Sequence, residues 1–215
     1  MMKPKLKVCG LTKLDQIQEL ISMNTDFLGF IFYEKSPRYV LNHLNLENIS
    51  KINHQGKVGV FVNENLETII ETVQKANLNF IQLHGDESEN FILELKEKLN
   101  PEIGIIKVIR IGSERLDSTS SIQETINRQL KNSNYLLFDT DSKAFGGTGK
   151  QFDWTLLKKL EISLPYFLSG GISEENINDI KILNQKPFVL DINSKFELEA
   201  GIKDVGKIRL FKAKI

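Results

Sequence analysis

The feature that most constrains the fold is an alternation of short apolar runs with stretches whose apolar residues recur at helical spacing. Several of the runs are apolar at consecutive positions, which is typical of parallel strands that are buried on both faces. The eight runs span residues 6–9, 27–31, 58–62, 80–83, 105–109, 135–138, 166–168 and 188–190. A repeating strand–helix pattern predicts a parallel sheet that is covered by helices.

The helical stretches place apolar residues three and four positions apart, on one face of a helix. They cover residues 14–21, 66–73, 91–99 and 177–183, whereas the segment 111–134 is rich in Ser, Asn and Gln and is less regular. Residues 12–15 have the spacing of a capping box, and Asp153 and Ser173 are predicted N-caps.

Eight strand–helix units in 215 residues leave about 27 residues for each unit. A doubly wound open sheet usually has a glycine-rich phosphate loop after its first strand, and residues 9–12 (CGLT) lack one. The pattern therefore favours a closed (β/α)8 barrel, an α/β fold, close to its minimum size. We expect residues 1–215 to form a single barrel domain.

Composition excludes several classes of protein. The 28 Lys and Arg residues balance 28 Asp and Glu residues, which argues against electrostatic binding to nucleic acid or to a membrane surface. No apolar run approaches the roughly 20 residues that span a bilayer, and the single cysteine cannot form an intramolecular disulfide. The N-terminal residues lack the apolar core of a signal peptide. We therefore expect a cytoplasmic protein.

Chemically reactive side chains follow the predicted strands, at the end of a barrel that carries catalytic groups. They are Cys9, His84, Asp139 and Asp191, of which His84 and Asp191 are candidate substrate-binding residues. Taken singly, Cys9 could be a small buried hydrophobe, Asp139 a cap, and His84 a residue that holds its turn through a backbone hydrogen bond. His43 and His54 are expected at the surface. No pair of side chains has the spacing of a metal site on a helix, so we expect no metal.

A phosphate site is predicted at the last two strands. Gly170 and Gly171 precede a helix expected from Glu174, and backbone N–H groups at a helix N-terminus favour an anion. Asn193, Ser194 and Lys195 supply donors after the final run. The segment 146–150 (GGTGK) does not fit a nucleotide-binding loop, and we interpret it as a loop that closes over the site.

Together these motifs resemble the phosphoribosylanthranilate isomerase family of tryptophan biosynthesis, over essentially the whole chain. The resemblance rests on residues 7–11 (KVCGL), 29–32 (GFIF), 36–39 (SPRY), 58–62 (VGVFV), 82–86 (QLHGD), 146–150 (GGTGK), 152–154 (FDW), 169–172 (SGGI) and 201–204 (GIKD). Each motif alone is weak, but their order and spacing are specific.

The resemblance implies a (β/α)8 isomerase that needs no metal or organic cofactor. Its reaction would be the Amadori rearrangement of N-(5-phosphoribosyl)anthranilate, a small phosphorylated substrate, to the corresponding ribulose phosphate. Cys9 would be the general base and Asp139 the general acid, while Arg38 would bind the anthranilate carboxylate. Nearby cations could lower the pKa of Cys9. Strand alternation is expected to point Lys7 to the opposite face, away from the neighbours of Cys9.

The chain departs from the family after the last strand, where residues 191–197 (DINSKFE) replace the common pattern DVSSGVE. Lys195 stands in place of a glycine, and its ammonium is a candidate phosphate contact or a solvent-facing lysine. Asp141 lies close enough to Asp139 to compete for the role of acid.

Two alternatives stay open at this point. Another phosphosugar barrel enzyme would place a lysine and glutamate, or paired aspartates, at the strand ends where this chain has Cys9 and Asp139. A non-catalytic phosphosugar-binding barrel would keep the phosphate donors and lose the acid or the base. The sequence does not separate a monomer from a homodimer.

Overall fold

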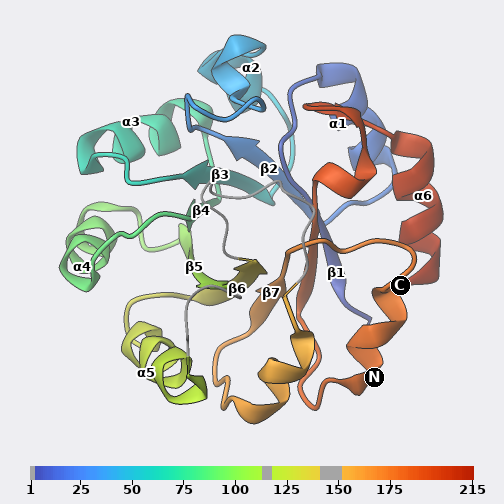
Figure 1. Cartoon of the computed structure of the whole chain (residues 1–215). Coiled ribbons are helices and arrows are strands. Elements are labelled where there is room, and N and C mark those ends of the chain that lie inside the picture. The colour runs from blue at the N-terminus through green and yellow to red at the C-terminus, as the bar shows by residue number, and fades with distance from the viewer. Residues whose placement is uncertain (1–2, 113–117, 141–151) are drawn as a thin grey trace.

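The structure, a computed structural model, describes residues 3–112, 118–140 and 152–215. Within them, eight parallel strands form a closed barrel in sequence order, with β8 paired to β1. The strands are β1 (Lys5–Val8), β2 (Phe27–Ile31), β3 (Lys57–Phe61), β4 (Phe80–Leu83), β5 (Gly104–Ile111), β6 (Tyr135–Thr140), β7 (Tyr166–Leu168) and β8 (Val189–Ile192). Helices surround this barrel (Figure 1). The predicted (β/α)8 fold is confirmed, and each predicted strand is present within a few residues.

The outer layer contains both α-helices and short 3-10 helices. The α-helices are α1 (Leu14–Ser22), α2 (Leu46–Ser50), α3 (Leu66–Ala76), α4 (Glu89–Lys98), α5 (Thr119–Gln129) and α6 (Val205–Lys214). The 3-10 helices are η1 (Val40–Asn42), η2 (Trp154–Lys159), η3 (Ile177–Ile182) and η4 (Ser194–Phe196). The predicted helix at 177–183 is thus a 3-10 helix, in a stretch where Asn176 and Asp179 can compete for backbone hydrogen bonds. A short antiparallel pair, β9 (Glu197–Glu199) and β10 (Ile202–Lys203), was not predicted.

Of the predicted helix caps, one is confirmed and two are wrong. Asp153 accepts a hydrogen bond from the Thr155 amide at the start of η2. The Thr12 hydroxyl donates instead to the carbonyl oxygen of Gly201, and α1 begins without a side-chain cap. Ser173 donates to the Glu175 carboxylate, and η3 begins only at Ile177. Both hydroxyls therefore stabilise tertiary or loop contacts rather than helix ends.

The barrel interior is apolar in its N-terminal half. This apolar plug consists of Phe27, Val58, Ile106, Val108, Leu137, Phe167 and Val189. Phe27 meets Phe80 and Phe167 edge-on, with ring centroids 5.3 Å apart in each pair. The plug fills the barrel below the C-terminal strand ends. The polar groups at those ends therefore rest on a packed apolar layer that excludes water.

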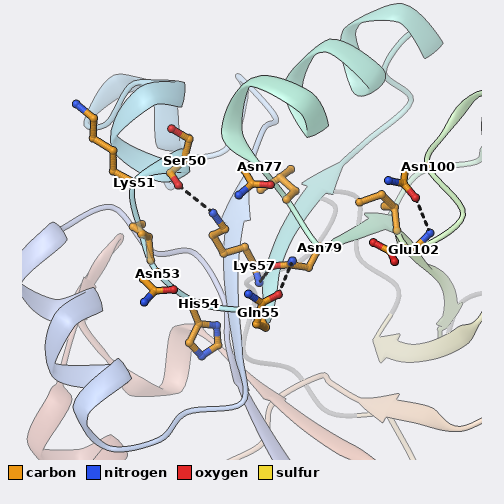
Figure 2. Close-up of a pocket in the computed structure, with 13 residues that line it drawn as sticks. Ser50, Lys51, Asn53, His54, Gln55, Lys57, Asn77, Asn79, Asn100 and Glu102 are labelled. Carbon is orange, nitrogen blue, oxygen red and sulfur yellow. Dashed lines mark hydrogen bonds between the residues drawn. The ribbon is translucent and has the colours of Figure 1, made fainter.

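A polar cavity of about 450 Å³ lies at the N-terminal ends of β3, β4 and β5. Figure 2 shows Lys57 and the other polar side chains that line it. Cys9 and Asp139 lie at the opposite, C-terminal ends of their strands. Lys57 is buried in the cavity and donates to the carbonyl oxygens of Ile49, Ser50 and Ala76, at 3.3–3.4 Å. These residues end α2 and α3, where carbonyls lack helical partners and a cation is favourable. We assign this cavity to stability rather than to catalysis.

His43 is exposed as expected, whereas His54 is half-buried. The Gly56 amide donates to Nδ1 of His54, so the ring proton lies on Nε2 and is donated to the Thr25 carbonyl, 2.9 Å away. His54 therefore fixes the turn before β3, and its assignment to the surface was wrong.

Gly29 of β2 allows the close approach of Cys9. A Cβ at this glycine would lie 2.9 Å from both the Cα and the Sγ of Cys9. We expect Gly29→Ala to lower the free energy of unfolding by about 1–3 kcal/mol, because overpacking must displace the β1 backbone. Urea denaturation measures this loss. Gly206→Ala is the control, because a Cβ there meets only an Asp204 oxygen at 3.5 Å. Equal stability of both variants would contradict the assignment.

Candidate active site

The predicted acid and base lie at the C-terminal end of the barrel. Cys9 directly follows β1 and is buried, and Asp139 is a buried residue of β6. His84 follows β4 and Asp191 belongs to β8, and both are buried. The strand ends therefore bring together the four side chains that the sequence singled out.

Lys7 belongs to the same end, and the prediction that it points away was wrong. Residues two apart on a strand face the same side, so Lys7 lies inside the barrel with Cys9. Its side chain is fully buried, and Nζ lies 2.7 Å from Oδ2 of Asp191 and 2.7 Å from Oε1 of Gln82. The ammonium is thus shared between β8 and β4.

The environment of Cys9 raises the pKa of its thiol. Burial is the main cause, and the negative charge of Asp191 adds to it. The ammonium groups of Lys7 and Lys203 act in the opposite direction, and Lys7 also hydrogen-bonds the sulfur. The cations expected around Cys9 are present, but the low pKa hypothesised from them is wrong because desolvation outweighs their attraction.

Asp139 has an environment suited to a general acid. Burial raises the pKa of its carboxyl group to about 7. Hydrogen bonds from the Thr140 amide, 2.8 Å from Oδ1, and from the Ser169 hydroxyl limit the rise. A carboxyl group with a pKa near the working pH can both hold and release a proton.

His84 contacts side chains rather than the backbone of its turn. Nδ1 lies 3.0 Å from Nε2 of Gln82, and Nε2 lies 3.5 Å from Oδ2 of Asp139. Burial lowers the pKa of the ring to about 3, helped by the charges of Lys7, Arg110 and Lys107. The ring is therefore neutral, and the interpretation that it holds the turn through a backbone hydrogen bond was wrong.

Arg38 lies in a second charged cluster at the same end. Its Nε and Nη2 atoms donate to the Glu197 carboxylate at 2.6–3.0 Å. Lys203 is buried and donates to the same carboxylate at 2.6 Å and to Oδ1 of Asn193 at 2.8 Å. Burial acts to raise the pKa of Glu197, but together these cations outweigh it and hold the pKa below its usual range. Arg38 is therefore already paired with one carboxylate of the chain itself.

The loops after β7 and β8 carry the predicted phosphate donors. Gly170 and Gly171 have φ values of 83° and 71°, and a Cβ on Gly170 would lie 2.5 Å from Oγ1 of Thr140. These glycines do not precede a helix directly, because η3 begins at Ile177, so the predicted helix N-terminus is absent. Ser194 begins η4, and the Lys195 side chain is exposed. Asp141 and the segment 146–150 lie outside the described residues.

The sequence interpretation missed five charged or polar residues of this end. They are Lys7, Gln82, Arg110, Glu197 and Lys203. Lys7 and Gln82 each stand two positions before a selected residue, and Arg110 is the register partner of Asp139. Strand alternation alone could have identified the first two.

Two further features bear on the class of protein. Among the described residues, no group of three or more His, Cys, Asp or Glu side chains is placed to hold a metal ion. Across the same part of the chain, no helix is long and apolar enough to span a membrane.

Comparison with known proteins identifies the family. The family model for N-(5'-phosphoribosyl)anthranilate (PRA) isomerase matches residues 6–214. The chain belongs to the phosphoribosylanthranilate isomerase family. It is 36% identical to the isomerase of Caldanaerobacter subterraneus subsp. tengcongensis, over 98% of this chain and 97% of that one. It is 35% identical to the isomerase of Parabacteroides distasonis, over 96% of this chain and 90% of that one.

Solved structures of this family share the fold. The phosphoribosylanthranilate isomerase of Thermotoga maritima has a TM-score of 0.79 and 30% identity, over 98% of this chain and 97% of that one. A second structure, of an isomerase in complex with reduced 1-(o-carboxyphenylamino)-1-deoxyribulose 5-phosphate, has a TM-score of 0.73 and 30% identity, over 97% and 96%. The family resemblance deduced from the motifs is confirmed.

The raised pKa of Asp139 predicts a pH-dependent cost in stability. The folded state binds this proton more tightly than the unfolded state, so the stabilisation is complete below about pH 4 and is lost as pH rises through about 7. We expect Asp139→Asn to be more stable than the parent protein at about pH 9, by up to a few kcal/mol, because it removes a buried charge. Urea denaturation of both proteins at about pH 4 and about pH 9 measures the free energies of unfolding. A stability difference between Asp139→Asn and the parent protein that does not grow from the lower to the higher pH would contradict the prediction.

Proposed function

We propose that this chain catalyses the isomerisation of N-(5-phosphoribosyl)anthranilate to 1-(2-carboxyphenylamino)-1-deoxyribulose 5-phosphate, the third step from chorismate in tryptophan biosynthesis. The observation that carries the proposal is the pair formed by a buried thiol, Cys9, and a carboxyl group with a pKa near 7, Asp139, at the catalytic end of the barrel. Family membership supports the substrate. The reaction as proposed uses neither a metal nor an organic cofactor.

Asp139 acts as the general acid in this proposal. It gives its proton to the ribose ring oxygen, and the bond between that oxygen and C1′ breaks while C1′ and the anthranilate nitrogen form a Schiff base. At neutral pH a large fraction of Asp139 still holds its proton, because burial raises its pKa to about 7. The Thr140 and Ser169 donors then stabilise the carboxylate that remains.

Cys9 acts as the general base. Its thiolate removes the C2′ proton of the Schiff base, and the enolamine that forms tautomerises to the ketose. The thiolate is a minor form because the pKa of Cys9 is raised, but Lys7 and Lys203 stabilise the charge when it forms. The active state therefore combines a protonated Asp139 with an ionised Cys9, and the macroscopic pKa values of the rate profile belong to this pair.

The substrate is held at its two anionic ends. Arg38 binds the anthranilate carboxylate, and backbone amides of Gly170 and Gly171 with Asn193, Ser194 and Lys195 bind the phosphate. His84 and Asp191 lie between these ends, beside the sugar. The enzyme works in the cytoplasm, as a monomer or a homodimer. The related isomerase of Thermotoga maritima is described as dimeric.

Removing the acid or the base should abolish most turnover. We expect Cys9→Ala and Asp139→Asn each to lower kcat by at least about 100-fold, because each loses a proton-transfer group. The fluorescence decrease of freshly prepared phosphoribosylanthranilate measures the rate, and circular dichroism checks the fold. Near-parental rates for either variant would refute that residue's role. Complementation of a tryptophan auxotroph that lacks this step tests the function itself.

Lys195 should affect phosphate binding more than chemistry. Its side chain is exposed beside Asn193 and Ser194. We expect Lys195→Ala to raise KM several-fold and to leave kcat within about two-fold, because a contact made equally in the ground and transition states changes KM alone. Lys158→Ala, an exposed lysine on η2, is the control. An unchanged KM would assign Lys195 to solvent.

A further inference from the structure

We propose that Lys7, Gln82 and His84 form a hydrogen-bond relay that fixes the tautomer of His84 and directs its Nε2–H group at the Asp139 carboxyl group. Gln82 is then a positioning residue for acid catalysis. The inference rests on the proposed role of Asp139 as the general acid. It replaces the direct substrate contact predicted for His84.

The first step of the relay is set by Lys7. An ammonium group only donates hydrogen bonds, so the atom of Gln82 that faces it must be the amide oxygen. The Oε1 atom lies 2.7 Å from Nζ of Lys7, and both side chains are buried. The opposite contact of Lys7, 2.7 Å to Asp191, holds the ammonium in place. The orientation of the Gln82 amide is therefore determined by charge.

The second step transfers this orientation to His84. With its oxygen toward Lys7, Gln82 presents its NH2 group to Nδ1 of His84 at 3.0 Å. Nδ1 must accept that hydrogen bond, so the single proton of a neutral ring lies on Nε2. Burial and the surrounding cations keep the ring neutral, since they lower its pKa to about 3. One tautomer of His84 is thus selected.

The third step connects His84 to the acid. Nε2 of His84 is buried, has no hydrogen-bond partner among the described residues, and lies 3.5 Å from Oδ2 of Asp139. This separation is longer than an ordinary hydrogen bond, and catalytic contacts of this kind often tighten in the reacting complex. Oδ1 already accepts from the Thr140 amide. Oδ2 is therefore the oxygen that releases the proton, and His84 donates to it once it is charged.

The relay explains why two neutral side chains, Gln82 and His84, connect the Lys7 ammonium to the Asp139 carboxyl group. A positive His84 would oppose Lys7, and a carboxylate at position 82 would remove the donor that Nδ1 needs. The neutral chain instead supplies a fixed dipole aimed at the charge that develops on Asp139, which is an effective form of transition-state stabilisation. The same Lys7 ammonium adjoins Cys9, so acid and base share one anchor.

The decisive variant is Gln82→Glu, which keeps the shape and the Lys7 contact but can only accept hydrogen bonds. The His84 proton should then move to Nδ1, and Nε2 would face Asp139 as an acceptor. We expect kcat to fall about 10- to 100-fold with KM within about two-fold, because one preorganised donor is lost. Gln74→Glu, the same charge change at an exposed position of α3, should change neither constant.

The tautomer itself can be measured by ¹⁵N NMR of the histidine rings. The chain has three histidines, and the His84 signals are assigned by their loss in His84→Gln. We expect the Nε2–H tautomer in the parent protein and the Nδ1–H tautomer in Gln82→Glu. His54, whose contacts also select Nε2–H, is an internal reference that should not change. This readout does not depend on turnover, so it separates failure of the relay from failure of the proposed isomerase activity.

Replacement of His84 gives a second test. A glutamine at position 84 can place an amide donor near the location of Nε2, whereas an asparagine reaches only the location of Nδ1. We expect His84→Gln to keep at least about ten-fold more kcat than His84→Asn. An Nδ1–H tautomer in the parent protein, an unchanged kcat in Gln82→Glu, or a change in KM alone would each overturn the relay. The parent spectrum decides the question even if a variant fails to fold.

Discussion

The polar end of this barrel depends on the buried ammonium of Lys7. A charge without solvent is unfavourable unless it is paired and hydrogen-bonded, and Lys7 meets that condition through Asp191 on β8 and Gln82 on β4. The pair spans the seam where β1 and β8 close the barrel. Removal of one partner would leave the other charge buried, so the closure of the sheet and the electrostatics of the site are coupled.

The division of the interior into two halves gives these charges their strength. The apolar plug excludes water from below, and the closed sheet excludes it from the sides. In such surroundings water screens ion pairs and hydrogen bonds only weakly, so these interactions are stronger than in bulk solvent. The same desolvation moves the pKa of Asp139 up toward neutrality and that of Cys9 upward as well. Burial thus suits the acid role proposed for Asp139 and opposes the base role proposed for Cys9, while the ammonium groups of Lys7 and Lys203 act to lower the pKa of Cys9.

Much of the fold and part of the site could be predicted from the sequence. Eight apolar runs gave the eight strands, and the residues after them included Cys9, His84 and Asp139. The hydroxyl of Thr12 was misassigned because local spacing says nothing of a distant group such as the Gly201 carbonyl that can accept its hydrogen bond. Ser173 was misassigned because its hydroxyl binds the nearby Glu175 carboxylate instead of a helix amide. Arg38 and Glu197 are 159 positions apart and meet only through barrel closure. Lys7, by contrast, was missed although strand alternation places it beside Cys9.

The ion pairs of the site have a consequence for how an anionic substrate enters. Lys7 faces Asp191, and Arg38 and Lys203 share Glu197, so each of these cations already has a carboxylate partner. The chain as a whole has a net charge of zero, so attraction of an anionic ligand depends on local groups rather than on a global field. In the proposed function, binding of the anthranilate carboxylate at Arg38 is an exchange with Glu197, and its selectivity depends on how well the incoming carboxylate replaces that partner.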